Sequence, residues 1–240
     1  MTRLIVLAAV LALLSVSTLF RRQKALKSLE DNIRKLRTLA VRAVSYRPLG
    51  DGDDEARKIL SGLDKGTDEL KQLGCTILGD YIEESIAVKL PTRWFVDADH
   101  TTFGWIAMAP TPLGLRDVAM MMTGGERAAI TLCTPRAAPG LTQPPHVDRV
   151  VREGFLDLKA ALAEHAARKP ADAKKIASID DAFAVVEDVR ARTATWREAQ
   201  PSDALLDQDL RSVLGRHYEK LGKSLAKRLA SDLPEARVRA

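Results

Sequence analysis

The amino-acid sequence predicts an α+β protein with a single N-terminal transmembrane helix, a helical stalk, a mainly antiparallel sheet of four to six strands and C-terminal helices. Three patterns predict this fold: an apolar N-terminal run followed by basic residues, short β-branched runs in the middle, and amphipathic periodicity in the last third. Strands that follow one another without intervening helices form antiparallel sheets, so strands followed by helices indicate an α+β domain.

The apolar run extends from Leu4 to Phe20 and predicts a transmembrane helix. At ~1.5 Å per residue it covers about 26 Å, slightly less than a ~30 Å hydrocarbon core, and the flanking arginines can snorkel to the interface. We therefore assign residues 1–23 to a membrane anchor and expect the lipid bilayer to be a partner through residues 4–20.

Basic residues are distributed unequally around this run. Arg3 alone precedes it, whereas Arg21, Arg22, Lys24 and Lys27 follow it. The positive-inside rule then predicts a single-pass protein of the cell membrane whose C-terminal domain is cytoplasmic.

A cleaved signal peptide is the alternative, because Ser15-Val16-Ser17 is a small-x-small triplet. Cleavage after Ser17 would leave basic residues at the new N-terminus, where they resist translocation, so the uncleaved anchor is preferred. If the signal were cleaved, the domain would be exported.

Residues 24–47 are predicted to form a basic helical stalk. Its apolar residues recur at spacings of three and four from Leu26 to Ala43, a seam too short for a coiled coil that predicts packing on a second copy or on the chain's own domain. Basic residues near an anionic leaflet bind lipid, although a solvated helix face explains them equally well. The expected lipid contacts are Arg21, Arg22, Lys24, Lys27, Arg34, Lys35, Arg37 and Arg42.

The formal net charge of +5 does not indicate nucleic-acid binding. Residues 21–47 contain nine Arg and Lys against two acidic residues, a net of +7, so the rest of the chain is close to neutral or slightly acidic. We therefore expect no nucleic-acid partner.

Residues 48–170 are predicted to be the α+β domain, and they begin with a helix. Asp51–Glu55 resembles the start of a calcium loop, but position 12 falls on Gly62, so we interpret it as a linker and helix N-cap. The helix is expected over 54–72, interrupted near Gly62 or Gly66 and capped by Gly74.

Six apolar or β-branched runs then predict the strands, and turn residues separate them. The turns are expected at Asp97–His100 and Thr123–Glu126, and a proline-rich loop at 134–145 is expected to end the sheet. The predicted runs are Cys75 to Ile82, Ile86 to Leu90, Arg93 to Val96, Phe103 to Ala109, Leu115 to Met122 and Ala128 to Cys133.

Three helices are expected after this loop. The first covers about 145–168 and places Val147, Val151 and Phe155 on one face; the second starts at a Ser178 capping box; the third runs from about 202 to 231. The short junction before the third helix predicts antiparallel packing, so residues 171–240 are expected to form a C-terminal helical hairpin.

No residue set stands out as a catalytic site, and Asp97, Asp99 and His100 are the weak candidates. Alternate residues of a turn could share a cation or orient an imidazole, but such residues more often bond their own backbone. His165 lies on the apolar face of its predicted helix and is expected to be a core or capping histidine.

The sequence contains no GxGxxG or phosphate-binding loop, no GxSxG, no HExxH and no CxxC. Cys75 and Cys133 lie in separate apolar runs without a neighbouring histidine cluster. We therefore expect no cofactor and no metal site, and whether the chain is an enzyme stays open.

The leading hypothesis is a single-pass membrane-anchored protein whose soluble α+β module serves binding or assembly at the membrane. Its partner would be another protein or a second copy, contacted through the stalk or the C-terminal helices. The alternative is a membrane-tethered or exported hydrolase with a site near Asp97, Asp99 and His100.

Overall fold

The computed structural model describes residues 23–24, 26–38, 45–84, 90–111, 114–135 and 140–230. They belong to two compact units, which are described separately. A sheet unit draws on residues 40–139 and 143–199, and a helical unit on 1–39, 140–142 and 200–240. The apolar run of the predicted anchor, residues 4–20, lies outside the described residues, and within the described ranges no helix combines the length and apolar character that crossing a bilayer requires.

The sheet unit contains a seven-stranded sheet in which every strand pairs with its neighbour in sequence. All pairs are antiparallel except β6 and β7, so the expected mainly antiparallel sheet is confirmed, with more strands than the predicted four to six. The strands are β1 (Tyr46–Pro48), β2 (Thr76–Glu83), β3 (Leu90–Val96), β4 (Phe103–Thr111), β5 (Gly114–Thr123), β6 (Ala128–Thr134) and β7 (Val147–Glu153).

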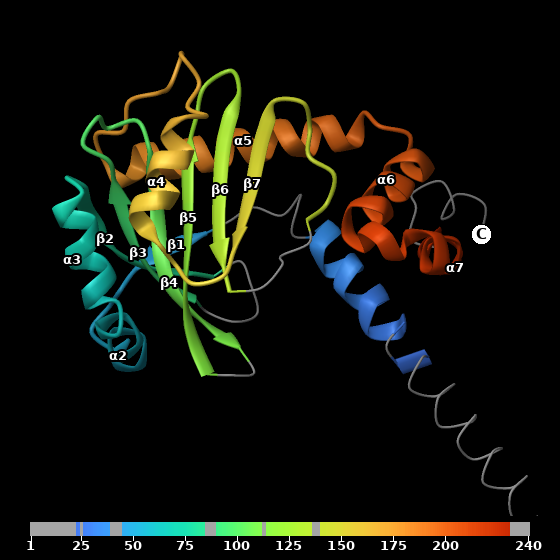
Figure 1. Ribbon diagram of the computed structural model, residues 1–240, viewed down its shortest axis with the longest axis horizontal. Coiled ribbons are helices and arrows are strands. Elements are labelled where there is room, and N and C mark those ends of the chain that lie inside the picture. Colours follow the sequence, from blue (N-terminus) through green and yellow to red (C-terminus); the bar gives the residue numbers. More distant parts are fainter. Residues whose placement is uncertain are drawn as a thin grey trace, which may run out of the picture. The chain divides into compact units, whose positions relative to one another are not determined.

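Helices cover both faces of this sheet (Figure 1). The helix α5 (Ile179–Glu198) packs on one face, and α2 (Asp54–Ser61), α3 (Asp64–Gln72) and α4 (Leu158–Ala166) pack on the other. Because successive strand residues point to opposite faces, Trp94 belongs to the α5 core whereas Phe95 belongs to the opposite core.

The predicted helix boundaries in this unit are partly confirmed. The helix expected over 54–72 is two helices separated at Gly62, and Gly74 adopts a φ of +82° after the second, as a helix-ending glycine does. Ser178 and Asp181 form the expected capping box, in which the Ser178 side chain accepts from the Asp181 amide and the Asp181 carboxylate accepts from the Ser178 amide.

The helix predicted over 145–168 is wrong in its first half. Val147–Glu153 is the strand β7, and only Leu158–Ala166 is helical. The spacing of four between Val147 and Val151 fits one face of a helix and one face of a strand equally well, so periodicity could not separate them. The loop at 134–145 therefore does not end the sheet; it crosses over to a parallel strand.

Two further boundaries differ from the prediction. Tyr46–Pro48 pairs with β2, so the stalk does not extend to residue 47. The runs expected at 86–90 and 93–96 correspond to one strand, Leu90–Val96, and residues 86–89 lie outside the described residues.

The described residues of the helical unit include the stalk helix at residues 23–24 and 26–38, together with α6 (Ser202–Leu214), the 3₁₀ turn η1 (Gly215–His217) and α7 (Tyr218–Leu229). Their apolar stripes form one core, so the stalk stripe packs on the C-terminal helices of its own chain. The single helix predicted from about 202 to 231 is broken at Gly215, whose φ of +48° favours glycine. The buried members of the core are Ile33, Leu206, Leu210, Leu214, Leu225 and Leu229.

The compact units do not coincide with the predicted boundaries at 48–170 and 171–240. The helix α5 belongs to the sheet unit because Ala182, Val185 and Val186 fill the core on one sheet face, whereas α6 and α7 belong to the helical unit. The antiparallel packing expected between α5 and the next helix would join the two units, and it stays a prediction.

Candidate functional site

The sequence candidates Asp97, Asp99 and His100 lie in the turn between β3 and β4. The Asp97 carboxylate accepts hydrogen bonds from the backbone amides of Thr101 (2.8 Å) and Thr102 (3.0 Å), and the His100 amide donates to the Asp97 carbonyl at 3.0 Å. His100 adopts a φ of +57°, a conformation that His tolerates better than most residues. These contacts are those of an aspartate that organises a turn.

The rest of this cluster is also hydrogen-bonded. The Lys169 ammonium lies 3.6 Å from the Asp97 carboxylate and 3.4 Å from that of Asp99, and the His100 ring nitrogen Nδ1 lies 3.1 Å from the Ile176 carbonyl oxygen. His100 therefore contacts backbone instead of either carboxylate. In the part of the chain that the structure describes, no three ligand side chains are grouped to hold a metal ion. The geometry favours the turn interpretation over a general-base site.

His165, in the sheet unit, is a titratable group with no exposed surface. Its Nε2 lies 2.9 Å from the Thr123 hydroxyl on β5, and its Nδ1 lies 2.8 Å from the Thr131 hydroxyl on β6. Burial, with the nearby Arg168 guanidinium as a smaller cause, lowers the pKa of His165 to about 4. A neutral imidazole enclosed in this way ties α4 to two strands and has no access to substrate.

In the turn after β5, the Glu126 amide already binds a carboxylate of the same chain. The Glu126 amide donates to the Asp172 carboxylate at 2.5 Å, and Arg192 donates to the carbonyls of Gly125 and Glu126. A β-carbon on Gly124 would lie 2.4 Å from Val185 on α5, so this glycine permits the close approach of strand and helix. An aspartate of the same chain already occupies the position of the anion.

Cys75 and Cys133 are both buried free thiols in the core beside α2, α3 and α4. Burial raises the pKa of the Cys75 thiol to about 11 and also raises that of Cys133. Both are protonated at neutral pH and are poor nucleophiles.

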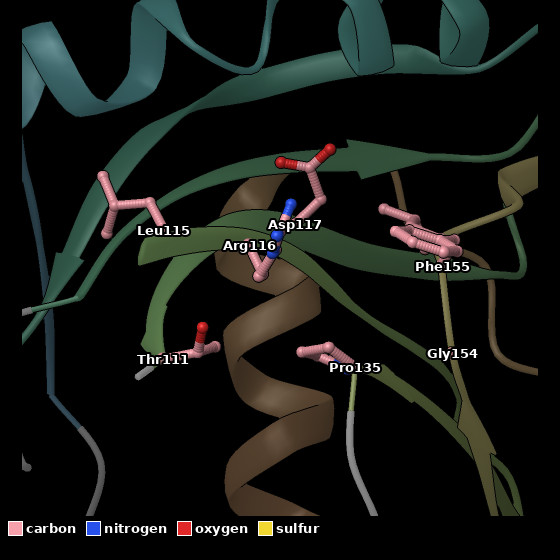
Figure 2. A pocket seen from close by; sticks show the side chains of 8 residues that line it. Thr111, Leu115, Arg116, Asp117, Pro135, Gly154 and Phe155 are labelled. Carbon is pink, nitrogen blue, oxygen red and sulfur yellow. The ribbon is translucent and has the colours of Figure 1, made fainter. Parts of the chain in front are cut away.

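An apolar cavity of about 320 Å³ lies at the N-terminal end of β5 and is shown in Figure 2. Two of its lining side chains are the large apolar residues that the described chain exposes most, with Phe155 95% and Leu115 45% accessible. We call this the β5 pocket, and its lining residues are Thr111, Leu115, Arg116, Asp117, Pro135, Gly154, Phe155 and Leu156.

Sequence reasoning missed this pocket because it placed Phe155 on the buried face of a helix. The available signal was Gly154, which has a φ of +118° and follows a segment compatible with a strand. Because β7 ends just before this glycine, the residue after it no longer belongs to the strand. That residue is the exposed Phe155.

The predicted lipid-contact residues are divided among several environments. Lys24, Lys27 and Lys35 are exposed on the stalk helix, and Arg34 is exposed while paired with Glu30 at 2.8 Å. The next basic residue, Arg37, lies 3.7 Å from the buried carboxylate of Asp209 on α6. Arg21, Arg22 and Arg42 lie outside the described residues.

Comparisons of the chain with protein-family models, with curated proteins and with solved structures find no match.

Proposed function

We propose that this chain is a single-pass membrane protein whose sheet unit binds a protein partner at the cytoplasmic face through the β5 pocket. The observation that supports it best is the exposure of Phe155 and Leu115 around one cavity, in a unit whose other large apolar side chains are mostly buried. Contiguous exposed apolar groups around a concavity are typical of interaction surfaces.

The chemistry of the β5 pocket suits a protein ligand. Leu115, Phe155 and Leu156 supply apolar area, and Arg116 and Asp117 place charges of both signs beside it. Protein interfaces combine a desolvated aromatic or aliphatic centre with a polar rim in this way. Covering Phe155 would remove from water a side chain that is almost fully hydrated in the chain alone.

Membrane attachment is the second part of the proposal. It is supported by the apolar run at 4–20, by the four basic residues that follow it within the next seven positions, and by the exposed Lys24, Lys27 and Lys35. Anchoring confines the sheet unit and a membrane-associated partner to a thin layer and raises their effective concentration.

The hydrolase alternative has weaker support. The Asp97 carboxylate is committed to two backbone amides and the His100 ring to a backbone carbonyl, and the β5 pocket is lined by neither residue. A general base needs a hydrogen bond to a reacting group, which these contacts do not provide.

Site-specific photocrosslinking in the cells that produce the protein tests the binding surface. We expect a photoreactive residue at position 155 to yield a single protein adduct in the membrane fraction, and the variant Leu115→Asp to abolish it. The adduct protein, once identified and purified, should bind the full chain and not the Leu115→Asp variant.

The matched control places the same photoreactive residue at position 51, whose side chain is fully exposed in the same unit. Adducts of equal yield from positions 51 and 155 would show random collisions and would contradict a binding role for the β5 pocket.

A further inference from the structure

The strand β5 extends beyond the part of it that pairs with β6. It pairs with β4 from Gly114 to Met122, but with β6 only from Ala119 to Thr123. No strand of the described residues pairs with the β6 side of residues 114–118. Within the described ranges, these residues therefore form an open sheet edge, whose backbone N–H and C=O groups can pair with another extended segment.

Pro135 explains why the ladder with β6 stops. The register that places Ala119 opposite Cys133 would place Asp117 opposite Pro135, and a proline has no N–H to donate to a ladder. The Thr134 carbonyl instead accepts from the Gly154 amide at 3.1 Å, on the β7 side. The described part of the chain thus leaves the β6 side of β5 unpaired at the point where the β5 pocket begins.

The open edge and the β5 pocket form one surface. Leu115 and Asp117 are in phase with Ala119 and Met121, which pack into the core beside α4, so they point to the face from which Phe155 and Leu156 approach. Figure 2 shows Leu115 and Asp117 on this stretch of β5, with Phe155 across the cavity. A side chain opposite Leu115 on an added strand would point into the same cavity.

We propose that the open edge binds an extended segment of a partner protein, which adds to β5 as an antiparallel strand and places an apolar side chain in the β5 pocket. This inference rests on the proposed function and states what its partner must offer. Backbone hydrogen bonds supply the attachment, and side chains at alternate positions supply the specificity.

Arg116 and Asp117 define the sequence that this edge accepts. Residues directly opposite one another in an antiparallel pair share a face, and opposite charges there stabilise the pair. The segment therefore carries an acidic residue opposite Arg116, a basic residue opposite Asp117 and an apolar residue opposite Leu115. In the N-to-C direction this reads basic, acidic, apolar.

A second copy of the chain fits this edge less well. Two copies related by a twofold axis pair residues whose numbers have an even sum, so centring the axis on Arg116 or on Asp117 places identical charges opposite each other. Centring the axis on Leu115 would place Asp117 opposite residue 113, which precedes the first residue of β5, Gly114. A segment of a different protein avoids both problems.

The test uses the full chain in detergent and a capped, fluorescent peptide Val-Lys-Glu-Leu-Thr, titrated by fluorescence anisotropy. We expect saturable binding, and binding weaker by about five- to tenfold for the control peptide Val-Glu-Lys-Leu-Thr. The double variant Arg116→Asp with Asp117→Arg should reverse this preference. A reversed preference cannot result from unfolding, because an unfolded chain loses both peptides.

Three results would overturn strand addition: no saturation with either peptide, equal affinity for both peptides, or the same preference in the double variant. A dimer of the parent chain that dissociates in the double variant would assign the edge to a second copy. If the crosslink at position 155 forms but the peptides fail, the proposed function stands and strand addition is wrong. If the peptides discriminate but no crosslink forms, strand addition stands and the cellular role is wrong.

Discussion

At the scale of single residues, buried polar groups in the sheet unit form hydrogen bonds that stabilise the fold. His165 illustrates this, since both of its ring nitrogens are bonded to threonine hydroxyls on neighbouring strands. The sequence correctly indicated a core histidine. It could not indicate Thr123 and Thr131, because these partners lie 42 and 34 positions away along the chain.

Acid should destabilise the sheet unit through His165. Its pKa is about 4 in the folded chain against 6.5 when unfolded, so below pH 6.5 the unfolded state takes up a proton that the folded state does not. The stabilisation is complete above pH 6.5, and about 3 kcal/mol should be lost by pH 4. Urea unfolding between pH 7 and 4 measures it.

The variant His165→Gln should show a smaller loss over the same pH range, and His100→Gln, at an exposed position, should behave like the parent chain. If His165→Gln and the parent lose stability equally, the buried imidazole is not the titrating group.

Asp97 should matter for stability and Asp99 should not. Asp97→Ala leaves two backbone amides without their acceptor, an expected cost of about 2 kcal/mol in the free energy of unfolding. Asp99 has a side chain that is 76% exposed, so Asp99→Ala should change stability by less than about 0.5 kcal/mol. Equal effects of the two variants would refute the turn interpretation.

At the scale of elements, the sequence predicted best where caps and turns are explicit. The Ser178 capping box, Gly74 and the turn at 97–100 were all found where residue chemistry placed them. It failed at β7, where a spacing of four suits helix and strand alike, and at Gly215, which interrupts a stripe that otherwise continues. Both failures concern the boundaries of helices and strands, which the local hydrophobic pattern alone does not determine.

The apolar stripe of α6 should hold the helical unit together. Leu210 is fully buried among the stalk helix, α6 and α7, so Leu210→Asp would bury an unpaired charge and cost several kcal/mol. Amide exchange should accelerate in α6, α7 and residues 26–38, while β3 to β6 stay protected. The exposed substitution Lys223→Asp is the matched control. Unchanged protection in Leu210→Asp would mean that the stripe does not hold these helices.

At the scale of the whole molecule, the proposed role joins a predicted N-terminal anchor to a sheet unit in which part of β5 has no described partner on its β6 side. The sequence predicted the mainly antiparallel sheet correctly, the anchor stays a prediction, and the open edge could not be predicted from the sequence. That edge depends on β5 extending past β6, and it becomes visible only when the register places Asp117 opposite Pro135. Strand lengths and pairings of this kind are set by tertiary contacts, not by local sequence.

The exposed stalk cations should give the chain affinity for anionic membranes. In the chain from residue 21 onward, changing Lys24, Lys27, Arg34 and Lys35 to Gln should weaken binding to anionic vesicles by a few kcal/mol at low salt, at about 1 kcal/mol per cation. Arg37 is left unchanged because it pairs with Asp209. Equal binding of the parent to neutral and anionic vesicles would exclude a charge contribution.

The orientation of the whole chain is tested most directly by reporters fused after Ala240. The account predicts that a fluorescent protein there is bright and stays in the membrane fraction, because the basic residues after the apolar run hold the C-terminal side in the cytoplasm. A phosphatase that is active only after export should be inactive at the same position. An active phosphatase, together with a mature chain that begins at Thr18, would show that the segment is a cleaved signal and would contradict the anchored, cytoplasmic binding module.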